Sequence, residues 1–272
     1  MQEKTVVTRY RNPGNHLGLR LALVTDLHNC DHTNLLQLLK QQSPDAILCA
    51  GDILERHDEG ASEWTGARID AVINSIGKQN AMEKFMWLLD RLTERTGRAT
   101  HEDEDTAIEF LKELPSIAST FYSVGNHEWY FLPSDYQMFK EKGITLLDNA
   151  DCLTEVNGQK IRIGGLSTRY DLEWLQRFSQ KDGFKILMCH HPEYYRKAIK
   201  NTDLDTFDLI VAGHYHGGQW RIWNRAVYVP RTGLFMKDAV GQFGKLIISA
   251  GTANTTRFSR RGNPCELVII EI

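Results

Sequence analysis

Five short apolar runs stand out along the chain, and each has the length of a single β-strand. They cover residues 19–24, 46–50, 121–124, 186–189 and 209–212, and they are rich in Val, Ile and Leu with little interruption by charge. Runs of this kind are typical of strands that are buried on both faces. The pattern therefore predicts the inner strands of a layered fold.

Segments with helical spacing lie between these runs. They are residues 35–39 after a cap at Thr33, residues 107–114 after an acidic stretch, and residues 171–180. Strands that alternate with helices predict an α/β fold. From Gln219 onward the runs at 226–229, 246–249 and 267–270 read as strands with few helices between them, which predicts a second sheet packed on the first.

One long connection interrupts the alternation. Residues 56–105 follow the second predicted strand and contain a predicted helix over 81–95. A connection of this length is commonly a lid, a binding element or a disordered segment. We therefore expect a single domain over residues 1–272 that carries an inserted, helical, lid-like segment at about 56–105.

Composition narrows the class of protein. The 272 residues are 42% hydrophobic and 25% charged, as in soluble globular proteins, and the net charge of −3 gives no reason to expect a nucleic-acid polymer as a partner. Five scattered cysteines without a CxxC pair favour a reducing cytoplasm. No run approaches the roughly 18 apolar residues of a spanning helix, so we expect no membrane span, while peripheral contact with a membrane stays open.

Residues that bind metals follow every one of the five predicted strands. In chain order they are Asp26 and His28, then Asp52, then Asn126 with His127 beside it, then His190, and finally His214 and His216. In open α/β sheets, ligands bind outside the carboxyl ends of the strands, so one site could gather all five strand ends. Any one of these motifs alone could be an ordinary turn or surface loop. The prediction therefore depends on all five occurring together.

The residue types favour two metal ions over one. Carboxylate, imidazole and amide oxygen suit Mn, Fe, Zn or Ni, and there are more candidate ligands than one tetrahedral ion can use. Asp52 could bridge two cations, as in sites that clamp both oxygens of an in-line displacement at phosphorus. Two rivals remain: a single-metal amide hydrolase, which leaves Asn126 and the bridging Asp52 unused, and a non-catalytic metal-binding scaffold.

The five motifs together resemble those of the calcineurin-like metallophosphoesterases. They read Asp26-x-His28, Gly51-Asp52, Gly125-Asn126-His127-Glu128, His190-x-Pro192 and Gly213-His214-x-His216, and Gly217-Gly218-Gln219 resembles a bacterial phosphodiesterase branch. The resemblance implies two mixed β-sheets packed as a sandwich and flanked by helices. It also implies hydrolysis of a phosphate ester, here a phosphodiester, with phosphomonoester hydrolysis as the alternative.

The same resemblance implies a role for each residue. One metal would take Asp26, His28, Asp52 and His216, and the other would take Asp52, Asn126, His190 and His214. A hydroxide between the two cations would attack phosphorus, and His127 would protonate the leaving group or stabilise charge on the phosphoryl oxygens. The family usually has Asp in place of Glu128, which bears on how His127 is oriented. We expect His191, next to a ligand, to pack around the site.

A basic stretch follows the last motif. Eight Lys and Arg residues lie between Gln219 and Gly262, interleaved with aromatic residues, and Asp238 is the only acidic residue there. The basic residues are Arg221, Arg225, Arg231, Lys237, Lys245, Arg257, Arg260 and Arg261. Guanidinium groups suit phosphate recognition, so we expect part of this stretch to border the site and the substrate to be anionic.

Overall fold

The structure is a computed structural model that describes residues 5–14, 16–56, 104–229, 232–254 and 259–272. The predicted insertion at about 56–105, with its helix over 81–95, lies almost wholly outside the described residues, as do Arg231 and Arg257 of the basic stretch. The lid-like role of the insertion and the single-domain organisation therefore stay predictions.

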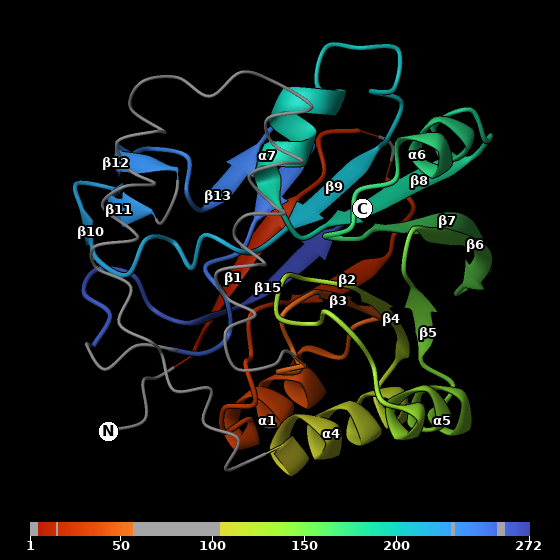
Figure 1. Cartoon of the computed structure of the whole chain (residues 1–272), viewed down its shortest axis with the longest axis horizontal. Helices are drawn as coiled ribbons and strands as arrows, with labels where there is room; N and C mark the ends of the chain where they lie inside the picture. Colours follow the sequence, from red (N-terminus) through yellow and green to blue (C-terminus); the bar gives the residue numbers. More distant parts are fainter. Residues whose placement is uncertain (1–4, 15, 57–103, 230–231, 255–258) are drawn as a thin grey trace.

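Two six-stranded sheets and one three-stranded sheet make up the described β-structure (Figure 1). The first sheet has, in order, β1 (Val6–Arg11), β15 (Glu266–Glu271), β2 (Arg20–Val24), β3 (Ala46–Ala50), β4 (Ser119–Ser123) and β5 (Thr145–Leu147). The second has β13 (Gly241–Phe243), β14 (Leu246–Ile248), β9 (Leu209–Ala212), β8 (Phe184–Cys189), β7 (Gln159–Leu166) and β6 (Ala150–Val156). The small sheet has β10 (Arg221–Ile222), β11 (Arg225–Val229) and β12 (Gly233–Met236).

The alternation of side chains along each strand explains the sandwich. In β2, Leu21 and Leu23 belong to the core between the two large sheets, which also contains Met188 and Val211 of the second sheet. Ala22 and Val24, which alternate with them, belong instead to the core under the helices of the first sheet. Because successive side chains point to opposite faces, an apolar residue at every position is what a strand covered on both faces requires.

Helices cover the two outer faces of the sandwich (Figure 1). α1 (Thr33–Gln42), α4 (Glu104–Glu113) and α5 (Pro133–Lys142) lie on the side of the first sheet, and α6 (Leu172–Ser179) and α7 (Pro192–Tyr194) lie on the side of the second. The Asp171 side chain caps α6 by accepting a hydrogen bond from the Trp174 backbone N–H at 2.9 Å. Within the described residues, no helix has both the length and the apolar character needed to cross a membrane.

The predicted α/β sandwich is confirmed, with two differences in strand placement. All five apolar runs form strands, but they divide between the sheets: β2, β3 and β4 in the first, β8 and β9 in the second. The late strands do not form a sheet of their own. β15 inserts between β1 and β2, β14 joins the second sheet, and β11 lies in the small sheet. The local pattern identifies strands, whereas their partners depend on residues far away along the chain.

Candidate metal centre

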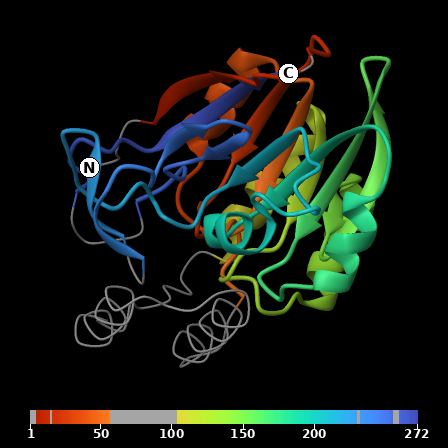
Figure 2. The ribbon, with the colours of Figure 1, turned by 90° about the horizontal axis from the view of Figure 1, so that it is seen from above.

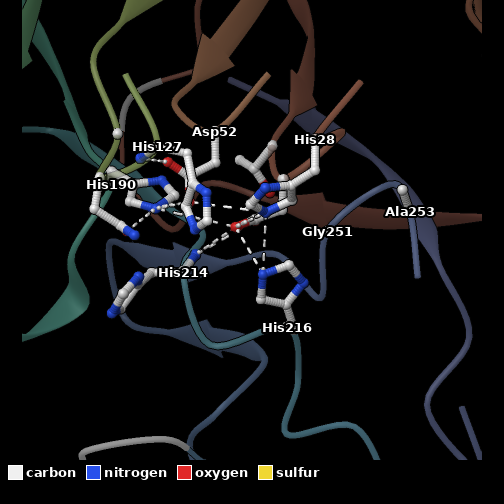
Figure 3. Close-up of polar contacts among 12 residues, drawn as sticks. His28, Asp52, His127, His190, His214, His216, Gly251 and Ala253 are labelled. Atoms are coloured by element: carbon white, nitrogen blue, oxygen red, sulfur yellow. Dashed lines mark hydrogen bonds and ion pairs between the residues drawn. The ribbon is translucent and has the colours of Figure 1, made fainter. Parts of the chain in front are cut away.

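The strand ends that carry the predicted ligands meet at one place (Figure 3). β2, β3 and β4 are parallel, and so are β8 and β9, so the carboxyl ends of each group lie along one edge. Backbone hydrogen bonds join the loops: the Asp26 N–H donates to the Gly51 carbonyl at 3.1 Å, and the Gly213 N–H donates to the His190 carbonyl at 3.1 Å. The site therefore lies where the two sheets of the sandwich adjoin.

Two groups of candidate ligands are close enough to hold an ion each. In the first, His28 Nε2 lies 3.3 Å from His216 Nε2, and His216 Nε2 lies 3.5 Å from Asp26 Oδ1. In the second, His190 Nε2 lies 3.1 Å from both Asp52 Oδ2 and Asn126 Oδ1. Because ligand atoms about 2.0–2.2 Å from an ion lie roughly 3–3.5 Å from one another, both donor sets fit a divalent cation.

Asp52 links the two groups. Its Oδ2 lies 3.1 Å from His190 Nε2 and 3.8 Å from His28 Nε2, so one carboxylate oxygen faces both. Burial raises the pKa of Asp52, but the neighbouring imidazoles of His190 and His127 lower it well below its ordinary value. Asp52 is therefore an anionic carboxylate that lies between the two groups of candidate ligands.

His214 contacts the centre in two ways. Its backbone N–H donates to both oxygens of Asp26, at 3.1 and 3.3 Å. Its ring lies close enough to Asp52 and His190 to hold an ion with them. It also lies close to His191 and Glu193, which form a second such group with it. His191 is buried, and its Nε2 lies 3.0 Å from the Thr168 hydroxyl, so it packs behind the centre as the sequence predicts.

Backbone strain is concentrated at the predicted ligands. Five of the seven have left-handed φ angles, namely Asp26 at 54°, His28 at 51°, Asp52 at 56°, His214 at 71° and His216 at 47°. A left-handed non-glycine residue costs about 1–3 kcal/mol and persists where the surroundings impose it, often at functional sites. The strands therefore end in turns that aim these side chains inward at a cost in backbone energy.

Glycines allow the loops to approach the carboxylates closely. A Cβ atom added to Gly125 would overlap the Asp52 side chain, and one added to Gly213 would overlap the Asp26 carboxylate. Neither position has space for a side chain larger than hydrogen. The glycines of the third and fifth motifs thus fit the packing around the ligands.

His127 lies beside the two ligand groups and is oriented by Glu55. Its Nδ1 is 2.8 Å from Glu55 Oε2, and its Nε2 is 4.0 Å from Asp52 Oδ2. The other oxygen of Glu55 is 2.6 Å from Nδ1 of His28, so one carboxylate holds two imidazoles. Burial lowers the pKa of His127, but the charges of Glu55 and Asp52 outweigh burial and raise it to about 10. The side chain of His127 is 36% exposed and keeps its proton, so it can act on a bound substrate.

Sequence reasoning did not identify Glu55. Its signal is local, because it stands three residues after Asp52 in the loop that follows β3, and a carboxylate there can reach back across the turn. A lone Glu in a loop carries little information without the position of His127, which comes from a different loop.

Glu128 does not orient His127. It is buried, and its two oxygens accept hydrogen bonds from the backbone N–H groups of Asp52 (3.0 Å), Ile53 (2.7 Å), Leu54 (3.1 Å) and Gly125 (2.6 Å) and from the Tyr122 hydroxyl (2.5 Å). Burial and then the charge of Asp52 raise the pKa of Glu128, while these hydrogen bonds act in the opposite direction. Glu128 thus fixes the loop that carries Asp52 to the loop that carries Asn126.

Replacing Glu128 is expected to destabilise the protein strongly. Glu128→Ala leaves four N–H groups in the interior without their acceptor, and each such group costs roughly 1–3 kcal/mol. We expect the free energy of unfolding, measured by chemical denaturation, to fall by at least about 3 kcal/mol. Glu173→Ala is the control, because that side chain is 87% exposed. Equal stability of the two variants would contradict this role of Glu128.

Among the described residues of the basic stretch, Arg260 contacts a predicted ligand. The Arg260 guanidinium lies 3.2 Å from His216 Nδ1 and donates to the carbonyls of Ala250 (2.6 Å) and Ala253 (2.5 Å). Arg260 therefore ties the loop after β14 to His216. Lys245 instead pairs with Asp205 at 2.8 Å, away from this loop.

The chain is similar in sequence to other known proteins. The chain is 30% identical over 142 residues to the protein YpbG of Bacillus subtilis, which covers 50% of this chain and 51% of that protein. It is 23% identical over 273 residues to the metallophosphoesterase Cj0846 of Campylobacter jejuni, covering 96% of this chain and 60% of that one. The chain thus spans about half or somewhat more of the length of these relatives.

Two solved structures are also similar. One is the phosphopantetheinyl hydrolase PptH of Mycobacterium tuberculosis, with 15% identity, a TM-score of 0.35, and coverage of 73% of this chain and 84% of that chain. The other is a 5'-nucleotidase precursor of Thermus thermophilus, with 13% identity, a TM-score of 0.35, and coverage of 86% of this chain and 49% of that chain.

The chain also matches a whole protein family. Residues 19–218 match the family described as calcineurin-like phosphoesterase. This range takes in most of the chain, from the start of the first predicted strand to the end of the fifth motif, and it contains all seven candidate ligands together with His127. The chain belongs to the calcineurin-like phosphoesterase family.

Proposed function

We propose that this protein is a phosphodiesterase that uses two divalent cations. The observation that supports the proposal most directly is the position of Asp52, whose Oδ2 faces His190 at 3.1 Å and His28 at 3.8 Å. A single-metal site has no use for a carboxylate shared by two groups of ligands. The Gly217-Gly218-Gln219 sequence after the fifth motif favours the diesterase branch, and hydrolysis of phosphomonoesters is the second candidate.

The proposed ligands divide between the two groups. Asp26, His28 and His216 would hold one ion, and Asn126, His190 and His214 the other, with Asp52 shared. Two ions held in this way would make a water molecule nucleophilic near neutral pH and would neutralise charge on phosphoryl oxygens. The donor set of nitrogen and oxygen atoms suits Mn, Fe, Zn or Ni.

His127 is placed to complete the reaction. A Glu55 oxygen accepts a hydrogen bond from Nδ1–H of His127, which directs Nε2 toward the space beside Asp52. A protonated Nε2 can donate to the oxygen that leaves phosphorus, so that the alcohol departs neutral. The chain itself thus supplies the orientation of the ligands and the proton for the leaving group.

This function is tested by measuring both the number of bound metal ions and the rate of phosphoester hydrolysis. We expect two bound ions per chain, loss of activity after chelation, and recovery with one of the four metals. Bis(p-nitrophenyl) phosphate should be hydrolysed faster than p-nitrophenyl phosphate. One ion without phosphoester turnover would favour the amide hydrolase, and two ions without turnover would favour the scaffold.

Glu55→Gln is expected to lower kcat by roughly 10–100-fold, the usual range for residues that orient metal ligands and catalytic imidazoles. The amide keeps the shape but loses the charge that fixes both rings. The loss should be larger for an alkyl phosphodiester than for a p-nitrophenyl ester, because the latter needs less help from an acid. Glu113→Gln, at an exposed position, is the control. An equal loss for both substrates would exclude a role of Glu55 through His127.

A further inference from the structure

The three-stranded sheet has one covered face and one open face. Cross-strand pairing aligns Arg221 with Ala226 and Ala226 with Met236, and Ala226 is fully buried, so this row faces the protein. Alternation along the strands puts the next row on the opposite side. That row contains Ile222, Arg225, Val227, Val229 and Phe235. Val229 at the end of β11 is fully buried, and the other four residues form the open face.

Large apolar side chains of the open face are exposed. Ile222 is 50% exposed and Phe235 is 56% exposed. Trp223, in the two-residue turn between β10 and β11, is 93% exposed, the highest value among the large hydrophobic residues that the structure describes. Exposure of several large apolar side chains on one small sheet is unfavourable, so a patch of this kind marks an interaction surface.

The segment that forms the small sheet is basic. From Gln219 to Lys237 the sequence has basic residues and no acidic one. Arg225 lies on the open face itself, where its guanidinium donates to the Phe235 carbonyl at 3.1 Å. An aromatic turn beside cationic side chains is complementary to a surface that has an apolar interior and a negatively charged boundary.

The size of the patch argues against a stable protein partner. Stable protein interfaces bury about 800 Å² on each side. The small sheet has strands of two, five and four residues and shows only one face. A bilayer needs no matching surface, because a few aromatic side chains can insert individually at the headgroup level.

We propose that the open face and the Trp223 turn dock onto an anionic lipid bilayer. The small sheet lies at the end of the molecule opposite β6 in both views of the ribbon (Figures 1 and 2). β10 begins five residues after His216, so docking holds the metal centre close to the bilayer. The inference goes beyond the proposed function, because binding to lipid requires neither metal nor turnover.

Vesicle flotation tests the proposal. The full chain is mixed with phosphatidylcholine vesicles, with or without about 30 mol% phosphatidylglycerol. We expect binding to the anionic vesicles, weaker binding in high salt, and a fall of at least about tenfold in partitioning for the double variant Trp223→Ser, Phe235→Ser. Leu153→Ser is the matched control, because Leu153 is equally exposed at 56% but lies on β6.

Hydrolysis of soluble bis(p-nitrophenyl) phosphate should be the same in all variants, which separates docking from the metal chemistry. The proposal is overturned if the parent does not bind anionic vesicles, or if the double variant binds them as well as Leu153→Ser does. It is also overturned if the parent is a dimer in sedimentation and the double variant is a monomer, since a second copy would then cover the patch.

Discussion

Asp52→Asn should abolish phosphoester hydrolysis, with a loss of at least about 10³-fold in kcat/KM, and should leave one bound ion or none. The amide keeps the shape of Asp52 but has no charge to offset two cations. The carboxylate also accepts a hydrogen bond from the His127 backbone N–H at 2.8 Å, so the substitution disturbs the third loop as well. Metal content by mass spectrometry and kcat/KM on bis(p-nitrophenyl) phosphate measure both effects.

Asp203→Asn is the control for this variant, because it removes one carboxylate from an exposed position. It should keep both ions and full turnover. If Asp52→Asn also kept two ions and near-parent turnover, the bridging assignment would be wrong, and the two groups of ligands would have to be independent.

His127→Ala should retain both ions and lower kcat by roughly 10²–10⁴-fold, the usual scale of general acid–base catalysis. We expect the metal to be retained because Nδ1 of His127 is held by Glu55, although His28, Asp52 and His127 together are also close enough to hold an ion. His16→Ala, at an exposed position, is the control. Both variants are compared by metal content and by single-turnover kinetics.

The leaving group provides an internal check on His127. An alkyl alcohol departs slowly without a proton donor, whereas p-nitrophenolate departs readily, so the effect of His127→Ala should shrink for the p-nitrophenyl ester. A loss of metal in His127→Ala would show that this residue is a ligand. An equal loss for both esters would point to stabilisation of phosphoryl charge rather than proton transfer.

The sequence allowed the strand ends to be predicted because two local signals coincide there. A run such as 46–50 is apolar at every position, and the polar residue that follows it, Asp52, marks where burial ends. The same two signals, an apolar run and the polar residue after it, occur at His190 and His214. They were enough to predict that the candidate ligands lie on one edge of a layered fold. The structure brings these residues together, while their roles as ligands stay predictions.

The remainder could not be predicted, because it depends on pairing between distant segments. Nothing in the sequence of residues 267–270 indicates that β15 pairs with β2 rather than with the other strands that follow Gln219. Nothing near Glu55 indicates that its carboxylate lies between His28 and His127, and three of the four backbone groups that hold Glu128 come from a loop more than seventy residues earlier. These are tertiary contacts, which periodicity and spacing do not encode.

The position of β15 has a consequence for biosynthesis. Leu23 pairs with Val268, so the strand that carries Asp26 at its end gains one of its neighbours only when residues 266–271 have left the ribosome. Pairing across so much chain is slow, because the entropy of loop closure must be overcome before the contact forms. During translation the earlier strands therefore expose an open edge, and a nascent chain stalled before β15 would be a target for chaperones rather than a folded protein.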